Sequence, residues 1–128
     1  MVEEVLRHAN PLHYFRRTAT EDTVLHDVPI ATGDKVVMVY TSANRDEDVF
    51  PDPFVFRVDR TPNPHIGFGM GEHVCLGAHL ARLELRCAFA ALLDRLEHCE
   101  PTGPVARMRS SFVGGIKRAP MRWRIRPR

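Results

Sequence analysis

The sequence has little of what membrane and secreted proteins contain. No apolar run approaches the roughly 18 residues that a membrane helix needs, because the longest, 87–93, has seven. The three cysteines form no CxxC pair, and an odd count is more typical of a reducing compartment than of a secreted protein. The start, Met-Val-Glu-Glu, is acidic and lacks the apolar segment of a secretory signal. These absences predict a cytoplasmic protein without a membrane span.

The composition is that of an ordinary globular protein. Hydrophobic residues make up 44% and charged residues 27% of the sequence. This mixture excludes a disordered segment, a collagen-like repeat and a disulfide-stapled miniprotein. A chain of 128 residues is long enough for one domain and too short for two. We therefore expect one unit, residues 1–128.

The charge is unevenly distributed along the chain. Residues 1–100 carry ten Lys/Arg and sixteen Asp/Glu, a net charge of −6, whereas residues 101–128 carry eight Lys/Arg and no acid, a net charge of +8. Such a basic segment can mark a nucleic-acid surface. Between 121 and 126, however, apolar and arginine residues alternate, which is typical of a strand with one solvated basic face. We favour the strand and expect no nucleic-acid partner.

Local signals predict several short elements. The helix-forming segment 2–9 ends at Asn10-Pro11. Residues 14–25 and 35–40 have the β-branched and aromatic character of strands, and the second of these reads as well buried. Four prolines exclude a long helix or a central strand from residues 46–64.

The clearest element is a helix over residues 79–96. Apolar residues recur at spacings of three and four on two different faces, which begin at Leu76 and Leu85. A helix that is apolar on two sides is normally buried on both. The other expected elements are too few to cover both faces, which predicts that these residues belong to a larger protein.

The segment Phe68-Gly-Met-Gly-Glu-His-Val-Cys-Leu-Gly77 holds the most informative pattern. Its closely spaced glycines permit positive φ and let the backbone pass where a side chain would collide with a flat ligand. Backbone N–H groups and the positive helix end favour the thiolate of a cysteine just before a helix, and a thiolate is a soft metal ligand. The plain alternative is a glycine-rich turn around a small buried cysteine. The offsets of the residues around Cys75 favour the ligand.

This segment resembles the heme-binding loop of the cytochrome P450 heme-thiolate monooxygenases, whose pattern is F-x-x-G-x-[HR]-x-C-x-G. The stretch from Glu4 to Arg7 is similar to the family's E-x-x-R helix, residues 43–56 to the region before its meander, and residues 80–84 to its heme-proximal helix. The resemblance implies an α+β fragment, the C-terminal part of the mainly α cytochrome P450 fold. Its parts would be the E-x-x-R helix, small β-sheets, the Cys loop and the heme-proximal helix.

The same resemblance implies heme b as the cofactor, with its iron axially ligated by Cys75. Such a thiolate pushes electron density toward the iron and favours O–O cleavage. The N–H groups of Leu76 and Gly77 would donate toward the sulfur, and Phe68 would pack beside it and limit water access. The heme propionates would pair with His73 and Arg17. The cofactor-binding set is thus Arg17, Phe68, Gly69, Gly71, His73, Cys75, Leu76 and Gly77, with no catalytic residue within the chain.

The resemblance also implies an ion cluster and two segments near the substrate. Glu4, Arg7 and Arg60 would form a buried ion cluster that locks the helix, the meander and the Cys loop together. From Glu4 and Arg7 alone, an exposed i,i+3 pair worth roughly a few tenths of a kcal/mol is the better prediction. Residues 10–15 and 111–114 would lie near the substrate.

The implied activity is oxygen-dependent hydroxylation of a small hydrophobic substrate, with electrons from a ferredoxin or flavin reductase. The sequence is similar to actinobacterial members that act on sterols or methyl-branched lipids. The family's oxygen-activating helix precedes the E-x-x-R helix, so we expect the N-terminal part and that helix to be absent from residues 1–128. The alternative is a catalytically silent heme-binding remnant or one half of a split protein.

A zinc site is the remaining alternative. His73, Cys75 and His79 form the pattern H-x-C-x3-H. This pattern supplies only three ligands and leaves the glycines unexplained. We therefore expect iron in place of zinc.

Overall fold

A computed structural model describes residues 1–127, so Arg128, the last of the eight basic residues of the C-terminal segment, lies outside the described residues. The helices are α1 (Val2–Ala9), α2 (Tyr40–Ala43) and α3 (Ala78–Leu93), and a 3-10 turn, η1, spans Gly71–His73. The strands form antiparallel pairs: β1 (Tyr14–Thr18) with β4 (Lys35–Val39), β2 (Thr23–Leu25) with β3 (Val28–Ile30), β5 (Leu96–Pro101) with β8 (Met121–Ile125), and β6 (Ala106–Arg107) with β7 (Ile116–Arg118).

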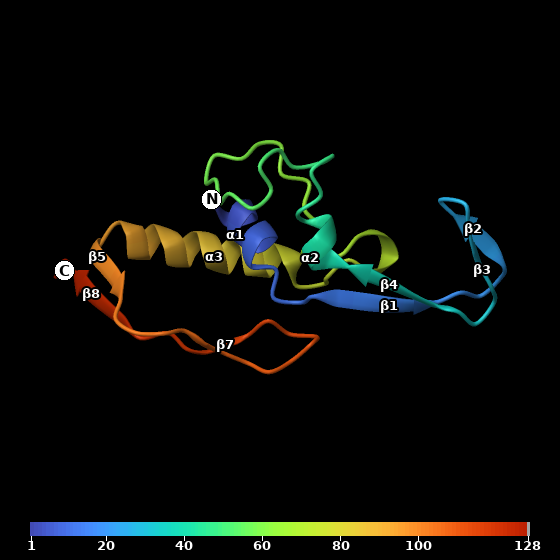
Figure 1. Ribbon diagram of the computed structural model, residues 1–128. Coiled ribbons are helices and arrows are strands. Elements are labelled where there is room, and N and C mark those ends of the chain that lie inside the picture. Colours follow the sequence, from blue (N-terminus) through green and yellow to red (C-terminus); the bar gives the residue numbers. More distant parts are fainter. Residues whose placement is uncertain (128) are drawn as a thin grey trace.

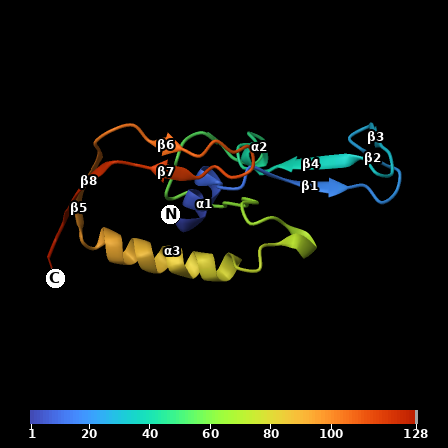
Figure 2. The same ribbon diagram turned by 90° about the horizontal axis from the view of Figure 1, so that it is seen from below.

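These elements lie in two layers, with α1 between them (Figure 2). The long helix α3 runs along one side, and the β1–β4 ribbon and the β6–β7 hairpin lie along the other. The β5–β8 pair lies at the C-terminal end of α3, and the β2–β3 hairpin extends from the far end of the β1–β4 ribbon (Figure 1). The loop that carries Cys75 enters α3 directly, so this helix sets the position of the loop's end.

Helix α1 confirms the predicted boundaries. It ends because Asn10 adopts a left-handed conformation with φ 36° and ψ 71°, and its N–H donates to the carbonyl of Leu6. Glu3 and Glu4 lie in the first turn and Arg7 in the last, an order that complements the helix dipole.

The strand predictions are right in position and wrong in burial. Residues 14–25 divide into β1 and β2, and β4 ends at Val39 because Tyr40 begins α2. The expectation of a well-buried second strand is wrong, since Val37 is 49% and Val39 46% exposed. Within the described residues β4 pairs with β1 alone, and its face that carries Val37 and Val39 is exposed.

Helix α3 is shorter than predicted. It ends at Leu93, and the expected last residue, Leu96, instead opens β5 and pairs with Ile125. The face of Leu85 is half-buried, whereas on the other face Leu80 is 59% exposed. The expectation that the remaining elements are too few to cover both faces is confirmed for the part of the chain that the structure describes.

The most deeply buried side chains are mainly polar. In order of volume, the fully buried ones are Arg7, Phe50, Glu4, Asn10 and Asn44. Glu4 and Arg7 form a two-pronged ion pair, with Nε to Oε2 at 2.8 Å and Nη2 to Oε1 at 2.7 Å. Arg7 Nη1 also donates to the carbonyls of Asn44 and Pro53, each at 2.8 Å. The core is therefore organised around one charged pair on α1.

The same carboxylate holds the irregular segment after α2. Glu4 accepts hydrogen bonds from Arg60 Nε at 3.2 Å, from the Arg57 backbone N–H at 2.8 Å and from Asn63 Nδ2 at 3.0 Å. The exposed i,i+3 pair expected from Glu4 and Arg7 alone is wrong, because these distant partners enclose both side chains. Burial alone would raise the pKa of Glu4, but the hydrogen bonds from Arg7 and Arg57 lower it to about 2.

We predict that Glu4→Gln lowers the free energy of unfolding by about 3–5 kcal/mol, because it leaves the buried Arg7 guanidinium without a counter-charge. Urea unfolding followed by circular dichroism measures this loss. Glu47→Gln, at an exposed carboxylate, serves as the control and should stay close to the unchanged chain. Equal losses in the two variants would contradict the prediction.

The contribution of the Glu4 carboxylate to the free energy of unfolding should also depend on pH. The folded pKa of Glu4, about 2, lies below its ordinary value of 4.5. The stabilising contribution is therefore complete above about pH 4.5 and is lost as the pH falls toward about 2. We expect the difference in unfolding free energy between the unchanged chain and Glu4→Gln to shrink across this window. A difference that stays constant would show that the carboxylate is not the source.

Candidate functional site

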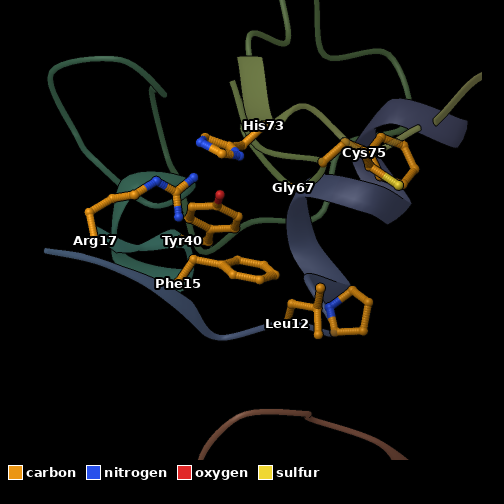
Figure 3. A pocket seen from close by; sticks show the side chains of 9 residues that line it. Leu12, Phe15, Arg17, Tyr40, Gly67, His73 and Cys75 are labelled. Atoms are coloured by element: carbon orange, nitrogen blue, oxygen red, sulfur yellow. The ribbon is translucent and has the colours of Figure 1, made fainter. Parts of the chain in front are cut away.

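A cavity of about 410 Å³ opens beside Cys75 (Figure 3). Its lining is mainly apolar, with two basic side chains and one thiol. The lining residues are Pro11, Leu12, Phe15, Arg17, Tyr40, Gly67, Phe68, His73 and Cys75. The structure thus brings together residues from β1, α2 and the Cys loop that lie far apart in the sequence. Of these, Tyr40 and Gly67 were not singled out from the sequence.

The Cys loop is closed by backbone hydrogen bonds. The N–H of Cys75 donates to the carbonyl of Phe68 at 2.8 Å. Gly69 and Gly71 adopt φ of +77° and +70°, a conformation that other residues adopt only with strain. A Cβ at Gly69 would also lie 3.1 Å from the Tyr40 hydroxyl, whereas one at Gly71 would meet nothing within 4 Å. Both glycines therefore allow the positive φ that the turn requires, and Gly69 also leaves space for the Tyr40 hydroxyl.

The surroundings of the Cys75 sulfur fit a thiolate ligand. Cys75 is exposed and lies three residues before the first residue of α3. Among residues 1–127, the backbone N–H groups of Leu76 and Gly77 have no hydrogen-bond acceptor. A Cβ on Gly77 would lie 3.9 Å from the sulfur, so the Gly77 backbone is close to it. Free N–H groups beside a sulfur stabilise its negative charge.

Two basic side chains lie away from the sulfur. β1 places the half-buried Arg17 and η1 places the exposed His73. Figure 3 shows both extending toward the Tyr40 hydroxyl, with Cys75 on the other side of the opening. Arg17 Nη1 donates to the carbonyl of Arg16 at 3.1 Å, which leaves its other N–H groups for a carboxylate. A thiol, apolar walls and carboxylate-binding donors form a set that fits a heme with propionates.

The two segments expected near the substrate lie side by side. The N–H of His13 donates to the carbonyl of Phe112 at 2.9 Å, and the N–H of Gly114 to that of Pro11 at 2.7 Å. The Phe112 ring meets the Phe15 ring edge to face, with 5.5 Å between centroids. Since Pro11 and Phe15 line the cavity, this contact connects the C-terminal segment to the cavity wall.

Asn44 connects the ion cluster to the Cys loop. Its carbonyl accepts from Arg7 at 2.8 Å, its Nδ2 donates to Asn10 Oδ1 at 3.2 Å, and its Oδ1 accepts the N–H of Ile66 at 2.8 Å. Sequence reasoning assigned Asn44 no role. The one sequence feature that points to a role for Asn44 is its place within residues 43–56, the stretch that resembles the region before the family's meander.

The described residues give no support to the alternative of a zinc site. Across residues 1–127, no three His, Cys, Asp or Glu side chains gather as a metal site would require, so His73, Cys75 and His79 do not form one. Over the same residues, no helix has the length and apolar character needed to cross a membrane.

A glycine-rich cysteine loop that leads into a long helix and is tied to a buried E-x-x-R cluster is the arrangement of the heme-thiolate proteins. The sequence model of one family, Cytochrome P450, matches residues 1–121. The chain belongs to the cytochrome P450 family.

Individual relatives agree with this assignment. The chain is 50% identical over 123 residues to the methyl-branched lipid omega-hydroxylase of Mycobacterium tuberculosis, covering 95% of the chain and 29% of that protein. It is 47% identical over 116 residues to the steroid C26-monooxygenase of Mycolicibacterium smegmatis, covering 90% of the chain and 27% of that protein. The crystal structure of CYP108D1 from Novosphingobium aromaticivorans matches 96% of the chain and 30% of its own, with a TM-score of 0.90 and 46% identity.

These matches confirm the predicted resemblance and the predicted fold class, a portion of the cytochrome P450 fold. The similarity to actinobacterial lipid- and sterol-hydroxylating members is also confirmed. The chain spans somewhat under a third of the length of these relatives.

We predict that Gly69→Ala is more damaging than Gly71→Ala. Both variants place a Cβ on left-handed backbone, which costs about 1–2 kcal/mol. Gly69→Ala additionally crowds the Tyr40 hydroxyl. Thermal unfolding and hemin binding by the two variants measure the difference, with Gly71→Ala as the matched control. Equal effects of the two substitutions would contradict the packing of Tyr40 against the loop.

Proposed function

We propose that residues 1–128 form the proximal, thiolate-bearing side of a heme-thiolate monooxygenase that hydroxylates a small hydrophobic substrate with dioxygen. The observation that carries this proposal is the position of Cys75. Cys75 lines an apolar cavity, and its sulfur lies next to the Gly77 backbone. Asn44 connects the buried ion cluster to Ile66, two residues before the Cys loop, because its carbonyl accepts from Arg7 and its Oδ1 accepts the N–H of Ile66.

Different residues of the chain would bind different parts of heme b. The Cys75 sulfur would bind the iron, the N–H groups of Leu76 and Gly77 would donate to that sulfur, and Arg17 and His73 would bind the propionates. Bound heme supplies the one-electron and dioxygen chemistry of the family, which a thiolate ligand adapts to O–O cleavage. Phe68 lines the cavity and would limit access of water to the sulfur.

The substrate would be a sterol or a methyl-branched lipid. This follows from the similarity to the two mycobacterial relatives, of which one is named for its action on a methyl-branched lipid and the other for its action on a steroid. Residues 10–15 and 111–114, which pair beside the cavity, would contact it. A ferredoxin or flavin reductase would deliver electrons from the Cys75 side.

The oxygen-activating helix of the family would be supplied by residues outside 1–128. The exposed face of α3, where Leu80 is 59% and Leu83 55% exposed, favours a protein in which further residues cover that helix. The second candidate is a catalytically silent heme-binding remnant or one half of a split protein. The same exposed face of α3 fits one half of a split protein, because the other half would cover it.

We predict that hemin binds the 128-residue chain and that the reduced, CO-treated sample gives the Soret band of a thiolate-ligated heme. Cys75→Ser should lose this band, because a serine hydroxyl does not replace the thiolate. Cys87→Ser, at an exposed cysteine of α3, is the matched control and should keep it. A band that survives in Cys75→Ser would overturn the assignment of Cys75.

A chimera distinguishes a working part of an enzyme from a catalytically silent remnant. In it, residues 1–121 replace the matching segment of the M. tuberculosis hydroxylase. If the chain is a working proximal side, the chimera should show the thiolate-type band and hydroxylate the methyl-branched lipid, and the Cys75→Ser chimera should lose both the band and the hydroxylation. A chimera that shows the band but does not hydroxylate the lipid would identify the chain as a catalytically silent remnant.

A further inference from the structure

A second charged network lies beneath the Cys loop and has no part in the proposed binding of heme. Arg82 of α3 places its guanidinium carbon 4.9 Å from the centroid of the Phe68 ring. Phe68 lines the cavity, and its carbonyl accepts the Cys75 N–H at 2.8 Å. Arg82 therefore contacts the residue that closes the loop around Cys75.

Glu3 of α1 anchors this arginine. Arg82 Nε lies 3.0 Å from both carboxylate oxygens of Glu3. His65 Nε2 also lies 3.0 Å from the same carboxylate, and His65 Nδ1 accepts the N–H of Gly67 at 3.1 Å. Because Nδ1 is an acceptor, the ring proton lies on Nε2 and is donated to Glu3. One carboxylate thus holds α3 and the start of the Cys loop together.

We infer that Arg82 is a positioning residue for Cys75. Anchored by Glu3, its guanidinium packs on the Phe68 ring, and this contact fixes the hairpin in which Phe68 and Cys75 are paired. An ion pair of this exposure contributes little by itself, but a planar guanidinium can pair with a carboxylate and stack on a ring at the same time. The consequence for iron binding rests on the proposed function. The effect of Arg82 on the packing of the loop is independent of that function.

Amide hydrogen exchange of Cys75 in the 128-residue chain tests the inference, because this N–H is the one that closes the hairpin. Arg82→Gln should accelerate exchange about two- to fivefold, the factor that corresponds to a lost cation–π contact. Arg82→Lys keeps a cation near Glu3 and should show a smaller increase. The amide of Ala19, which donates to Asp34 at 2.9 Å at the far end of the β1–β4 ribbon, is the internal reference and should not change.

Arg86→Gln is the matched control, because Arg86 lies on α3 and is exposed; it should leave Cys75 exchange unchanged. Unchanged exchange at Cys75 in Arg82→Gln would overturn the inference. Equal acceleration at Cys75 and Ala19 would also overturn it, since Arg82 would then only stabilise the whole chain.

The hemin-loaded chain gives a second readout. Arg82→Gln should lower the fraction of the reduced CO complex that shows the thiolate-type band, with Arg86→Gln as the control. An unchanged fraction would contradict the positioning of Cys75. If the unchanged chain lacks this band, the proposed function fails, and the exchange measurement still decides whether Arg82 positions the loop.

Discussion

The buried ion pair between Glu4 and Arg7 is the interaction on which the rest of the structure depends. The described chain has few fully buried apolar side chains, and its deepest groups are polar. Arg7 donates to the carbonyl of Asn44, before the proline-rich segment 46–64, and to that of Pro53 within it, and Glu4 accepts from Arg60 further along the same segment. A segment with neither helix nor strand thereby obtains a fixed geometry. Because the charges compensate each other in a buried place, removal of either leaves the other unsatisfied.

The cysteine is held from two directions by neighbouring residues of one helix. Successive side chains on a helix point about 100° apart, so Glu3 and Glu4 face different parts of the chain. Glu4 pairs with Arg7, whose guanidinium donates to the carbonyl of Asn44, and Asn44 Oδ1 accepts the N–H of Ile66, two residues before the Cys loop. Glu3 holds Arg82, which packs on Phe68 near the loop's closing hydrogen bond. An eight-residue helix thus positions a sulfur that lies far along the sequence.

Local chemistry explains what the sequence could predict, and distant partners explain what it could not. The end of α1 at Asn10 and the turn at Gly69 depend on residues within a few positions, so local patterns indicate them. The burial of Glu4 depends on Arg60 and other residues more than fifty positions away, and spacing alone favours the wrong, exposed pair. Leu96 continues the apolar period of α3 but pairs with Ile125 in β5. Asn44 acts through hydrogen bonds that no sequence period marks.

Ligation of heme iron by the Cys75 sulfur is tested most directly by X-ray absorption at the iron edge of the hemin-loaded chain. The expected result is a sulfur atom in the first coordination shell, replaced by a nitrogen or oxygen atom when residue 75 is changed from cysteine to serine. An iron that has only nitrogen and oxygen neighbours in the unchanged protein would contradict this ligation. So would a sulfur neighbour that persists after the substitution.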